Sequence, residues 1–319
     1  MQPSYNTQSR RKFLQTTAAL GYGVCVSGFA AANRFEEEPI IDIHQHLHYH
    51  GRSDADLIRH QASMGVTTSI LLPAGTPANR ASTNFGASNW LEAQVSGNEQ
   101  AFSFSQKNPG RFLFGVSEVP DLDNAHKTIR GYLEKGACII GELKFAVDCN
   151  SSYMHKIYEL AAVFNVPVLM HWQFERFNFG FDRFHETLKK YPSVNFIGHA
   201  QTWWAQVDKN YADPRNLYPE GPWTSGGITD RLLADYHNIY ADMSAGSGLN
   251  FLTRDEAQAA SFIERHQDKL MFGSDCEDVT GVSPSCVGAE TIRMIRKLAT
   301  DKKTERKLLY ENAKRVFRL

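Results

Sequence analysis

The stretch Pro39–His46 reads PIIDIHQH, a short apolar run that ends in two histidines. Runs of the same kind recur along the chain, and each carries a side chain that can bind a metal ion. These side chains are His44 and His46 in the first run, Glu142 within CIIGELKF, His171 closing VPVLMH, His199 closing VNFIGH and Asp275 closing LMFGSD. Strands that end in metal-ligand residues are typical of a (β/α)8 barrel, whose active site lies at the C-terminal ends of its strands.

Eight apolar runs of strand length predict the eight strands of such a barrel. They are Pro39–His46, Val66–Pro73, Phe112–Val119, Cys138–Phe145, Val166–His171, Val194–His199, Asn238–Asp242 and Lys269–Asp275. Near-continuous Val, Ile, Leu and Phe is expected of parallel strands that are buried on both faces, and helical sequence separates the runs. The sequence therefore predicts an α/β fold, a single (β/α)8 TIM barrel of the metal-dependent hydrolase type over residues 33–319.

Two stretches near the C-terminus predict helix boundaries. Thr253–Glu256 has the Thr-x-x-Glu form of a capping box, which predicts that a helix begins here and runs to about His266. Thr304–Phe317 has the periodicity of a closing amphipathic helix.

Composition places the chain among ordinary globular proteins. Its 319 residues are 42% hydrophobic and 22% charged, enough for one barrel of roughly 250 residues with additions. The formal net charge of −1 gives no reason to expect a nucleic acid or an anionic membrane as partner. The expected partner is a small-molecule substrate, and a homo-oligomer is left open.

The first 32 residues have the layout of an export signal. Ser9–Leu14 reads SRRKFL and precedes the apolar segment Thr16–Ala32, which ends in three alanines. A basic start, a short apolar middle and a small-residue end describe a secretory signal, and the arginine pair resembles the twin-arginine type. Residues 1–32 are thus predicted to be a twin-arginine signal peptide, with the export machinery as a partner and the periplasm as the destination. The alternative is an uncleaved anchor.

Four cysteines lie beyond that segment, at positions 138, 149, 276 and 286. An even number in an oxidising compartment permits disulfides, although the spacing is not that of a small disulfide-stapled domain. Cys276 follows Asp275 directly, so its thiol either packs in the core or reaches the site.

The alternation of a strand assigns faces within the first run. Residues two apart point the same way, so Asp42, His44 and His46 share one face and Ile41 and Ile43 face the surrounding helices. Two imidazoles on one face can bind one ion.

The ends of three later runs add further ligands. His171 and His199 are each the polar end of an otherwise apolar run, in register with the first histidine pair. Asp275 at the end of the eighth run can ligate the ion and also accept a proton from water.

Glu142 and Lys144 face inward from the fourth strand and admit several interpretations. Glu142 can bridge two ions, and Lys144 can do so only if its amine is carboxylated. The two can instead form a structural salt bridge. The preferred interpretation makes Glu142 a metal ligand and Lys144 a cation for the substrate or the developing oxyanion.

Aromatic residues gather near the sixth run. The long connection Ala200–His237 contains Trp203 and Trp204, and Trp172 follows His171. Loops after barrel strands lie over the active-site face, so these three indoles are predicted to bind substrate. The alternative is that they fix the long loop to the body of the protein.

Together these motifs resemble the amidohydrolase superfamily, and within it the amidohydrolase-2 type of predicted metal-dependent TIM-barrel hydrolases. The matching stretches are DIHQH, GELKF, VPVLMH, FIGHA, NIYADMS, LMFGSD and ENAKRVF, which span Ile40–Phe317. The resemblance implies that His44, His46 and His171 are metal ligands, that His199 is a ligand or stabilises the transition state, and that Asp275 is ligand and base. Many members carry a carboxylated lysine on the fourth strand, whereas this chain has Glu142 two residues before Lys144.

The predicted function is that of a metal-dependent hydrolase, activating water for attack on a lactone, ester or amide carbonyl of a small substrate. One or two divalent ions per chain are expected, with zinc favoured and manganese, iron or cobalt as alternatives. Such families also contain decarboxylases of small aromatic or unsaturated acids, which is the first alternative. The second is a non-catalytic binding protein on a metal-stabilised barrel.

Overall fold

The protein was analysed as a computed structural model, which describes residues 38–83 and 95–319. The predicted signal peptide, residues 1–32, lies outside the described residues. In that part of the chain each of the eight predicted strands is present, with tighter bounds. They are β1 (Ile40–Gln45), β2 (Val66–Leu71), β3 (Phe112–Phe114), β4 (Ile140–Leu143), β5 (Val168–His171), β6 (Phe196–His199), β7 (Ile239–Asp242) and β8 (Leu270–Met271).

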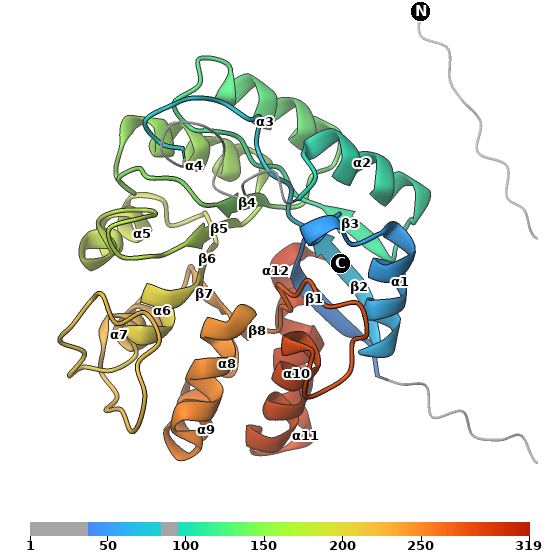
Figure 1. Cartoon of the computed structure of the whole chain (residues 1–319). Helices are drawn as coiled ribbons and strands as arrows, with labels where there is room; N and C mark the ends of the chain where they lie inside the picture. Colours follow the sequence, from blue (N-terminus) through green and yellow to red (C-terminus); the bar gives the residue numbers. More distant parts are fainter. Residues whose placement is uncertain (1–37, 84–94) are drawn as a thin grey trace, which may run out of the picture. The chain divides into compact units, whose positions relative to one another are not determined.

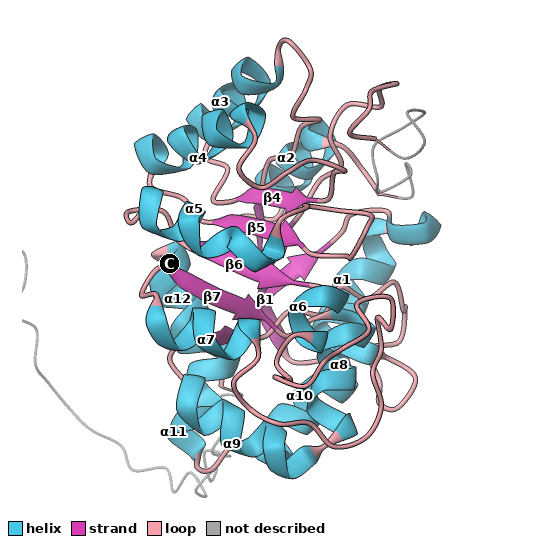
Figure 2. Cartoon of the chain, turned by 90° about the vertical axis from the view of Figure 1, so that its left-hand side faces the viewer, coloured by secondary structure: helices cyan, strands magenta, loops and turns pink. Residues whose placement is uncertain are grey.

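The strands form one closed parallel ring. Ladders join β1, β2 and β3 in that order, and β4 to β8 in that order. A parallel bridge between Val116 and Ile140 connects the two groups, and the Ile43 N–H donates to the Phe272 carbonyl at 3.2 Å on the other side. This closure, with helices outside the strands (Figures 1 and 2), confirms the predicted (β/α)8 barrel.

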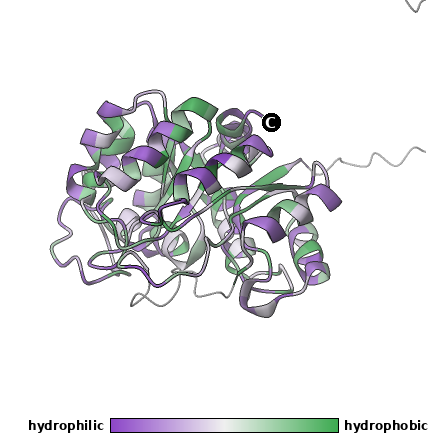
Figure 3. Ribbon diagram, turned by 90° about the horizontal axis from the view of Figure 1, so that it is seen from above, coloured by the Kyte–Doolittle hydropathy of each residue, from purple (hydrophilic) through white to green (hydrophobic). Residues whose placement is uncertain are grey.

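Helices separate successive strands. They are α1 (Asp54–Ser63), α2 (Asn98–Lys107), α3 (Ala125–Glu134), α4 (Ser152–Phe164), α5 (Phe184–Lys190), α6 (Gln201–Ala205), α7 (Ile228–Asp235), α8 (Ala245–Arg254), α9 (Glu256–His266), α10 (Val287–Leu298), α11 (Lys302–Arg306) and α12 (Asn312–Phe317). Short 3-10 helices are η1 (Tyr49–Gly51) and η2 (Phe181–Arg183), and η3 (Lys307–Glu311) is a π-helix between α11 and α12. The helices show both hydrophilic and hydrophobic stretches along their length (Figure 3). Among the described residues, no helix combines the length and the apolar character needed to cross a membrane.

The predicted capping box at Thr253 is wrong. Thr253 lies in the last turn of α8, and the side chain of Asp255 caps α9 by accepting from the Gln258 N–H. Since α8 continues to Arg254 and α9 begins at Glu256, the break between them is the single residue Asp255. The predicted end at His266 is confirmed.

A small apolar cluster fills the inside of the ring. Leu169 and Ile197 stand two residues before His171 and His199, on the same strand faces, and pack with Ile41 and Ile43. The expectations that Ile41 and Ile43 face the outer helices, and that Asp42 shares a face with His44 and His46, are therefore wrong. Residues of α12 join this cluster.

An irregularity in β1 explains these errors. In β1 the register shifts between Asp42 and Gln45, so three residues of β1 pair with two of β2. An extra residue in a strand reverses the alternation beyond it. His44 and His46 thereby follow Ile43 to the inner side, and a similar shift in β4 lies between Ile140 and Leu143.

Candidate active site

The six predicted ligands converge at the C-terminal ends of the strands. They are His44 and His46 from β1, Glu142 from β4, His171 from β5, His199 from β6 and Asp275, which follows β8. All except Asp275 are nearly inaccessible to solvent, and the Asp275 side chain is 13% exposed. Residues separated by more than 200 positions thus form one buried cluster.

The HxH pair presents two nitrogens to the same point. The Nε2 atoms of His44 and His46 lie 3.2 Å apart. Their Nδ1 atoms are held from behind, that of His44 by Asp242 at 2.7 Å and that of His46 by the Leu72 carbonyl at 2.7 Å. An imidazole anchored through Nδ1 keeps its Nε2 lone pair directed at an ion.

Two carboxylates span the cluster. Glu142 Oε2 lies 3.7 Å from His44 Nε2 and 3.8 Å from His46 Nε2. Its other oxygen, Oε1, lies 2.5 Å from His171 Nδ1 and 3.6 Å from His199 Nε2. Glu142 therefore turns one oxygen to each pair of histidines.

Asp275 repeats this arrangement from the opposite strand. Its Oδ1 lies 3.4 Å from His46 Nε2 and 3.7 Å from His44 Nε2, and its Oδ2 lies 3.7 Å from His199 Nε2. Glu142 and Asp275 both connect the HxH pair with His199.

These separations fit a divalent ion. Donor atoms at about 2.0–2.2 Å from one ion lie about 3.0–3.6 Å from one another. The Nε2 atoms of His44 and His46 lie 3.2–3.8 Å from each other and from the nearest oxygens of Glu142 and Asp275, close to that range. Asp275 Oδ1 and His171 Nε2 are also buried without a hydrogen-bond partner among the described residues. Buried polar atoms without partners are rare, so a cation is the natural partner for this donor set.

Electrostatics favour the same conclusion. Burial lowers the pKa of His44, but the charges of Asp275 and Asp242 outweigh it and hold that pKa well above its usual value. Burial and the nearby Lys144 ammonium lower the pKa of His171 to about 4, which keeps this imidazole neutral and able to ligate. Carboxylate charges that attract a cation, next to a neutral imidazole that can donate a lone pair, suit a metal ion.

Asp242 is a site residue that the sequence reasoning missed. It is fully buried, and its Oδ2 lies 2.7 Å from His44 Nδ1 and 3.2 Å from His199 Nδ1. The Ser244 hydroxyl donates to the same oxygen at 2.8 Å. A signal was present, because Asp242 closes the seventh run in the same way as His171 closes the fifth.

Tyr49 is the second missed residue. Its ring contacts His46 edge to face at 4.9 Å, and it lines the same cavity as Asp275. The Asp275 charge, together with burial, raises the pKa of Tyr49 far above its usual range. No strand pattern could reveal it, because Tyr49 lies in η1 beyond the strand end.

A cavity of about 510 Å³ opens above the cluster. Asp275, His171, His199, Lys144 and Tyr49 line it. Lys144 therefore reaches the site as predicted, and Glu142 forms no ion pair with Lys144 in the part of the chain that the structure describes, so the interpretation as a structural salt bridge is wrong.

Backbone strain gathers at the rim of this cavity. Ala200, Ala245 and Asp275 have φ angles of 82°, 61° and 40°, a region that residues other than glycine seldom adopt, and all three line the cavity. Strained residues persist where the surrounding structure fixes them, and they cluster at functional sites.

The three predicted substrate-binding tryptophans lie in the core, and none of them lines this cavity. Trp203 packs on β6 where Gly198 has no side chain, since a Cβ there would meet the indole at 2.2 Å. Trp204 stacks on Phe251 and donates its N–H to the Asp242 carbonyl at 3.0 Å. Trp172 packs against Phe184. The prediction is wrong for Trp203 and Trp204, because α6 turns their indoles towards the barrel. It is also wrong for Trp172, whose indole packs against Phe181 and Phe184 and not beside the ligands.

A closed parallel barrel with imidazoles and carboxylates at its mouth defines a class, the TIM-barrel enzymes of the amidohydrolase superfamily. The sequence profile of a family described as amidohydrolase matches residues 41–319. The chain belongs to this family. No curated protein matches the chain in sequence.

Solved structures share the fold at low identity. An uncharacterized TIM-barrel protein from Bordetella bronchiseptica has a TM-score of 0.59 and 14% identity, covering 88% of this chain and 98% of that one. A probable 2-pyrone-4,6-dicarboxylic acid hydrolase from Acinetobacter baumannii, with citric acid bound, has a TM-score of 0.57 and 14% identity over 88% and 99%. The 2,6-dihydroxybenzoate decarboxylase from Rhizobium has a TM-score of 0.54 and 12% identity over 88% and 98%. The same barrel fold is thus found in a probable hydrolase and in a decarboxylase.

Proposed function

We propose that the protein is a metal-dependent hydrolase that activates water for attack on the carbonyl of a small lactone, ester or amide. The observation that carries the proposal is the position of Asp275. This carboxylate opens on the cavity, whereas Glu142 and Asp242 are buried beneath it. Hydrolysis requires a proton acceptor beside the substrate, and a carboxylate facing the cavity meets that requirement.

The donor set assigns the residues that would hold the metal. His44, His46 and Asp275 form one group of closely spaced donors, and Glu142, His171 and His199 form a second that adjoins it through Glu142 Oε2. A bound divalent ion polarises a carbonyl and lowers the pKa of a coordinated water to about 7. The mixture of imidazole and carboxylate favours zinc, with manganese, iron and cobalt as alternatives.

Other residues act on the substrate and on the proton. Asp275 takes the proton of the attacking water, and the Tyr49 ring packs edge to face on His46 beside it. His199, fixed through Nδ1 by Asp242 and Ser244, stabilises the charge that develops on the carbonyl oxygen. Lys144 supplies a positive charge at the cavity wall.

The cavity lining suggests the substrate class. Polar side chains such as His50, Gln201, Ser247 and Lys144 surround a space of about 510 Å³. A space of this size suits a small molecule. A lysine on the wall favours a substrate with a carboxylate beside the scissile carbonyl.

The test is turnover of a substrate panel by the purified chain loaded with zinc or manganese. Carboxylated lactones stand first in the panel, in view of the likeness to a probable pyrone dicarboxylate hydrolase, followed by esters, amides and hydroxylated aromatic acids. We expect uptake of one labelled oxygen from water per product and no carbon dioxide. Asp275→Asn should lower turnover by about 10²-fold or more.

Two results would overturn the proposal. Release of carbon dioxide from an aromatic or unsaturated acid, without uptake of labelled oxygen, would make the protein a decarboxylase. Tight binding of panel members without turnover at any metal loading would make it a binding protein.

A further inference from the structure

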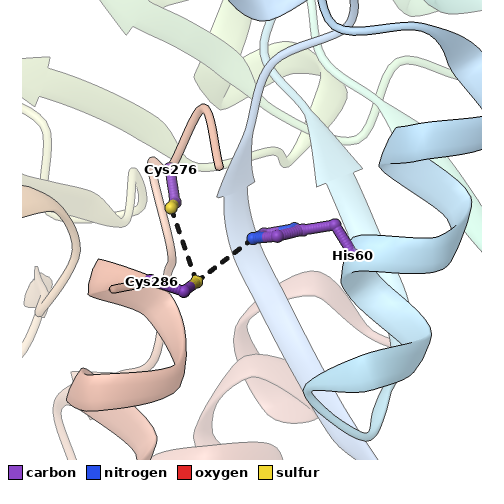
Figure 4. Close-up of side chains that lie close together, drawn as sticks. All are labelled: His60, Cys276 and Cys286. Atoms are coloured by element: carbon purple, nitrogen blue, oxygen red, sulfur yellow. Dashed lines mark hydrogen bonds between the residues drawn. The ribbon is translucent and has the colours of Figure 1, made fainter. Parts of the chain in front are cut away.

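Beside the cavity above the ligand cluster, the thiols of Cys276 and Cys286 lie close to each other and to the imidazole of His60. Cys276 Sγ lies 3.5 Å from Cys286 Sγ, and His60 Nε2 lies 3.2 Å from Cys286 Sγ. Figure 4 shows the three side chains directed at one another from separate segments. Cys276 follows Asp275, Cys286 caps the first turn of α10, and His60 belongs to α1.

The hydrogen bonds around His60 fix the direction of its proton. Gln61 Oε1 accepts from the Ser69 hydroxyl at 2.9 Å, so the amide nitrogen of Gln61 faces His60 Nδ1 at 3.2 Å and donates to it. In a neutral imidazole the other nitrogen, Nε2, then carries the proton. His60 therefore donates to Cys286 Sγ and has no lone pair on Nε2 for a metal.

Cys286 accepts a second hydrogen bond. The Ala289 N–H donates to its sulfur at 3.4 Å, at the N-terminus of the twelve-residue helix α10. These two hydrogen bonds, and the hydrogen bond that the Cys286 thiol donates to Met64 Sδ at 3.8 Å, hold the Cys286 sulfur in place beside Cys276. Cys286 is therefore positioned to attack an oxidised sulfur at Cys276.

The two thiols differ in access. Cys276 lines the 510 Å³ cavity, whereas Cys286 is fully buried behind it. A small oxidant that enters the cavity meets Cys276 first. Cys138 and Cys149, by contrast, have no second thiol within hydrogen-bond distance among the described residues.

We propose that Cys276 and Cys286 are a redox pair, with a small peroxide as the oxidant. Cys276 sulfur attacks one peroxide oxygen, the O–O bond breaks, and a sulfenic acid and one water form. Cys286 sulfur then attacks Cys276 sulfur, the S–O bond breaks, and the disulfide and a second water form. Two thiols and one hydrogen peroxide thus give one disulfide and two waters, with both thiol protons in the waters.

Oxidation of Cys276 is expected to affect the active site because Cys276 is bonded directly to Asp275 along the chain. A disulfide has an S–S distance of about 2.05 Å, so the sulfurs must approach from 3.5 Å and Cys276 must move towards α10. Asp275 is the next residue and contacts His44 and His46. Resting on the proposed function, we infer that the disulfide form is less active and that a reductant restores it.

The direct test does not depend on activity. Trypsin releases Leu270–Arg293, which contains Cys276 and Cys286 and no internal Lys or Arg. After hydrogen peroxide treatment of the full chain and blocking of free thiols, this peptide should be lighter than the reduced one by two hydrogens. Its two blocking groups should be absent, and dithiothreitol should restore both. A peptide that keeps two free thiols, or gains oxygen without a link, would overturn the proposal.

Variants provide matched controls. Cys286→Ser should leave Cys276 oxidised but without a disulfide, whereas Cys149→Ser should oxidise like the parent. His60→Gln should slow disulfide formation about tenfold, the effect of losing one hydrogen bond to a charged group. If Cys286→Ser instead loses one bound metal per chain that Cys149→Ser retains, the cluster is a soft-metal site and the proposal is wrong.

The hydrolase and redox proposals can fail separately. A disulfide in Leu270–Arg293 without any hydrolytic activity leaves the redox pair and removes the hydrolase. Hydrolytic activity that stays the same with and without the disulfide removes the inferred coupling to Asp275.

Discussion

His44 Nδ1 lies 2.7 Å from Oδ2 of Asp242, and both side chains are fully buried. The same oxygen lies 3.2 Å from His199 Nδ1, so one carboxylate orients two rings from different strands. The His44 ring therefore takes its orientation from Asp242 on β7. Carboxylates behind ligating histidines fix tautomer and orientation and strengthen metal binding.

Asp242→Asn should weaken metal binding by about 10–100-fold, because an amide nitrogen facing His44 Nδ1 disrupts the tautomer. Metal affinity measured by competition with a chelator tests this. Asp230→Asn is the matched control, since Asp230 is also a buried carboxylate that contacts a histidine, His266, away from the cavity. Equal affinities for the parent and Asp242→Asn would contradict the assignment.

Removal of the HxH pair should abolish metal binding. His44→Ala combined with His46→Ala deletes two donors that lie 3.2 Å apart, and elemental analysis should find no bound divalent ion. His48→Ala with His50→Ala repeats the spacing on exposed histidines and should retain the metal. A double His44/His46 variant that is active without metal would refute the proposed function.

The number of ions should respond to Glu142. If Glu142 bridges two ions, Glu142→Gln should lower metal content from about two towards one per chain and slow turnover severely. Retention of one tightly bound ion, as in the parent, would make the site mononuclear. Lys144→Met should keep the metal and impair turnover or raise KM, whereas metal loss in this variant would indicate a carboxylated lysine.

Stability should fall in acid through Asp230. Burial raises the pKa of this carboxyl, but hydrogen bonds from His266 and the Gly226 N–H and the Arg265 charge together hold it below its usual value. The unfolded chain therefore binds this proton more readily, so the stabilisation is present above about pH 4 and is lost as the pH falls through the folded pKa. The free energy of unfolding should decline more steeply for the parent than for Asp230→Asn between about pH 5 and 2. Parallel declines would contradict this account.

We also propose that residues 1–32 direct export by the twin-arginine route, with the mature protein in the periplasm. Arg10→Lys with Arg11→Lys should leave the precursor in the cytoplasm. Fractionation of bacteria expressing the full chain measures this, and Lys12→Arg is the control that keeps the pair. Unchanged localisation of the double variant would remove the assignment.

The strand pattern was sufficient for the barrel, because strands buried on both faces produce long apolar runs and their polar ends stand out. His44, His46, Glu142, His171 and His199 were found in this way, and so was Asp275. The face assignment within β1 failed because alternation assumes a regular strand, and the register shift after Asp42 is not visible in the residue types.

The aromatic prediction failed for a different reason. Composition showed that the connection after β6 contains Trp203 and Trp204, but their direction depends on tertiary packing. Gly198 leaves the space that Trp203 fills, and this match lies between a strand and the helix that follows it. Tyr49 was missed because it lies in η1, beyond the end of β1, where no strand pattern applies.

The first strand of the barrel meets the last, which affects how the protein is made. The Asp275 N–H donates to the His44 carbonyl at 2.8 Å, and residues of α12 pack with Ile41 and Ile43. During synthesis on the ribosome, His44 and His46 emerge early, whereas Asp275 is among the last residues of the barrel to be made. Domains fold as units during synthesis. A nascent chain that lacks the segment after β8 has no Asp275, so the proposed set of metal ligands is complete only after that segment has been synthesised.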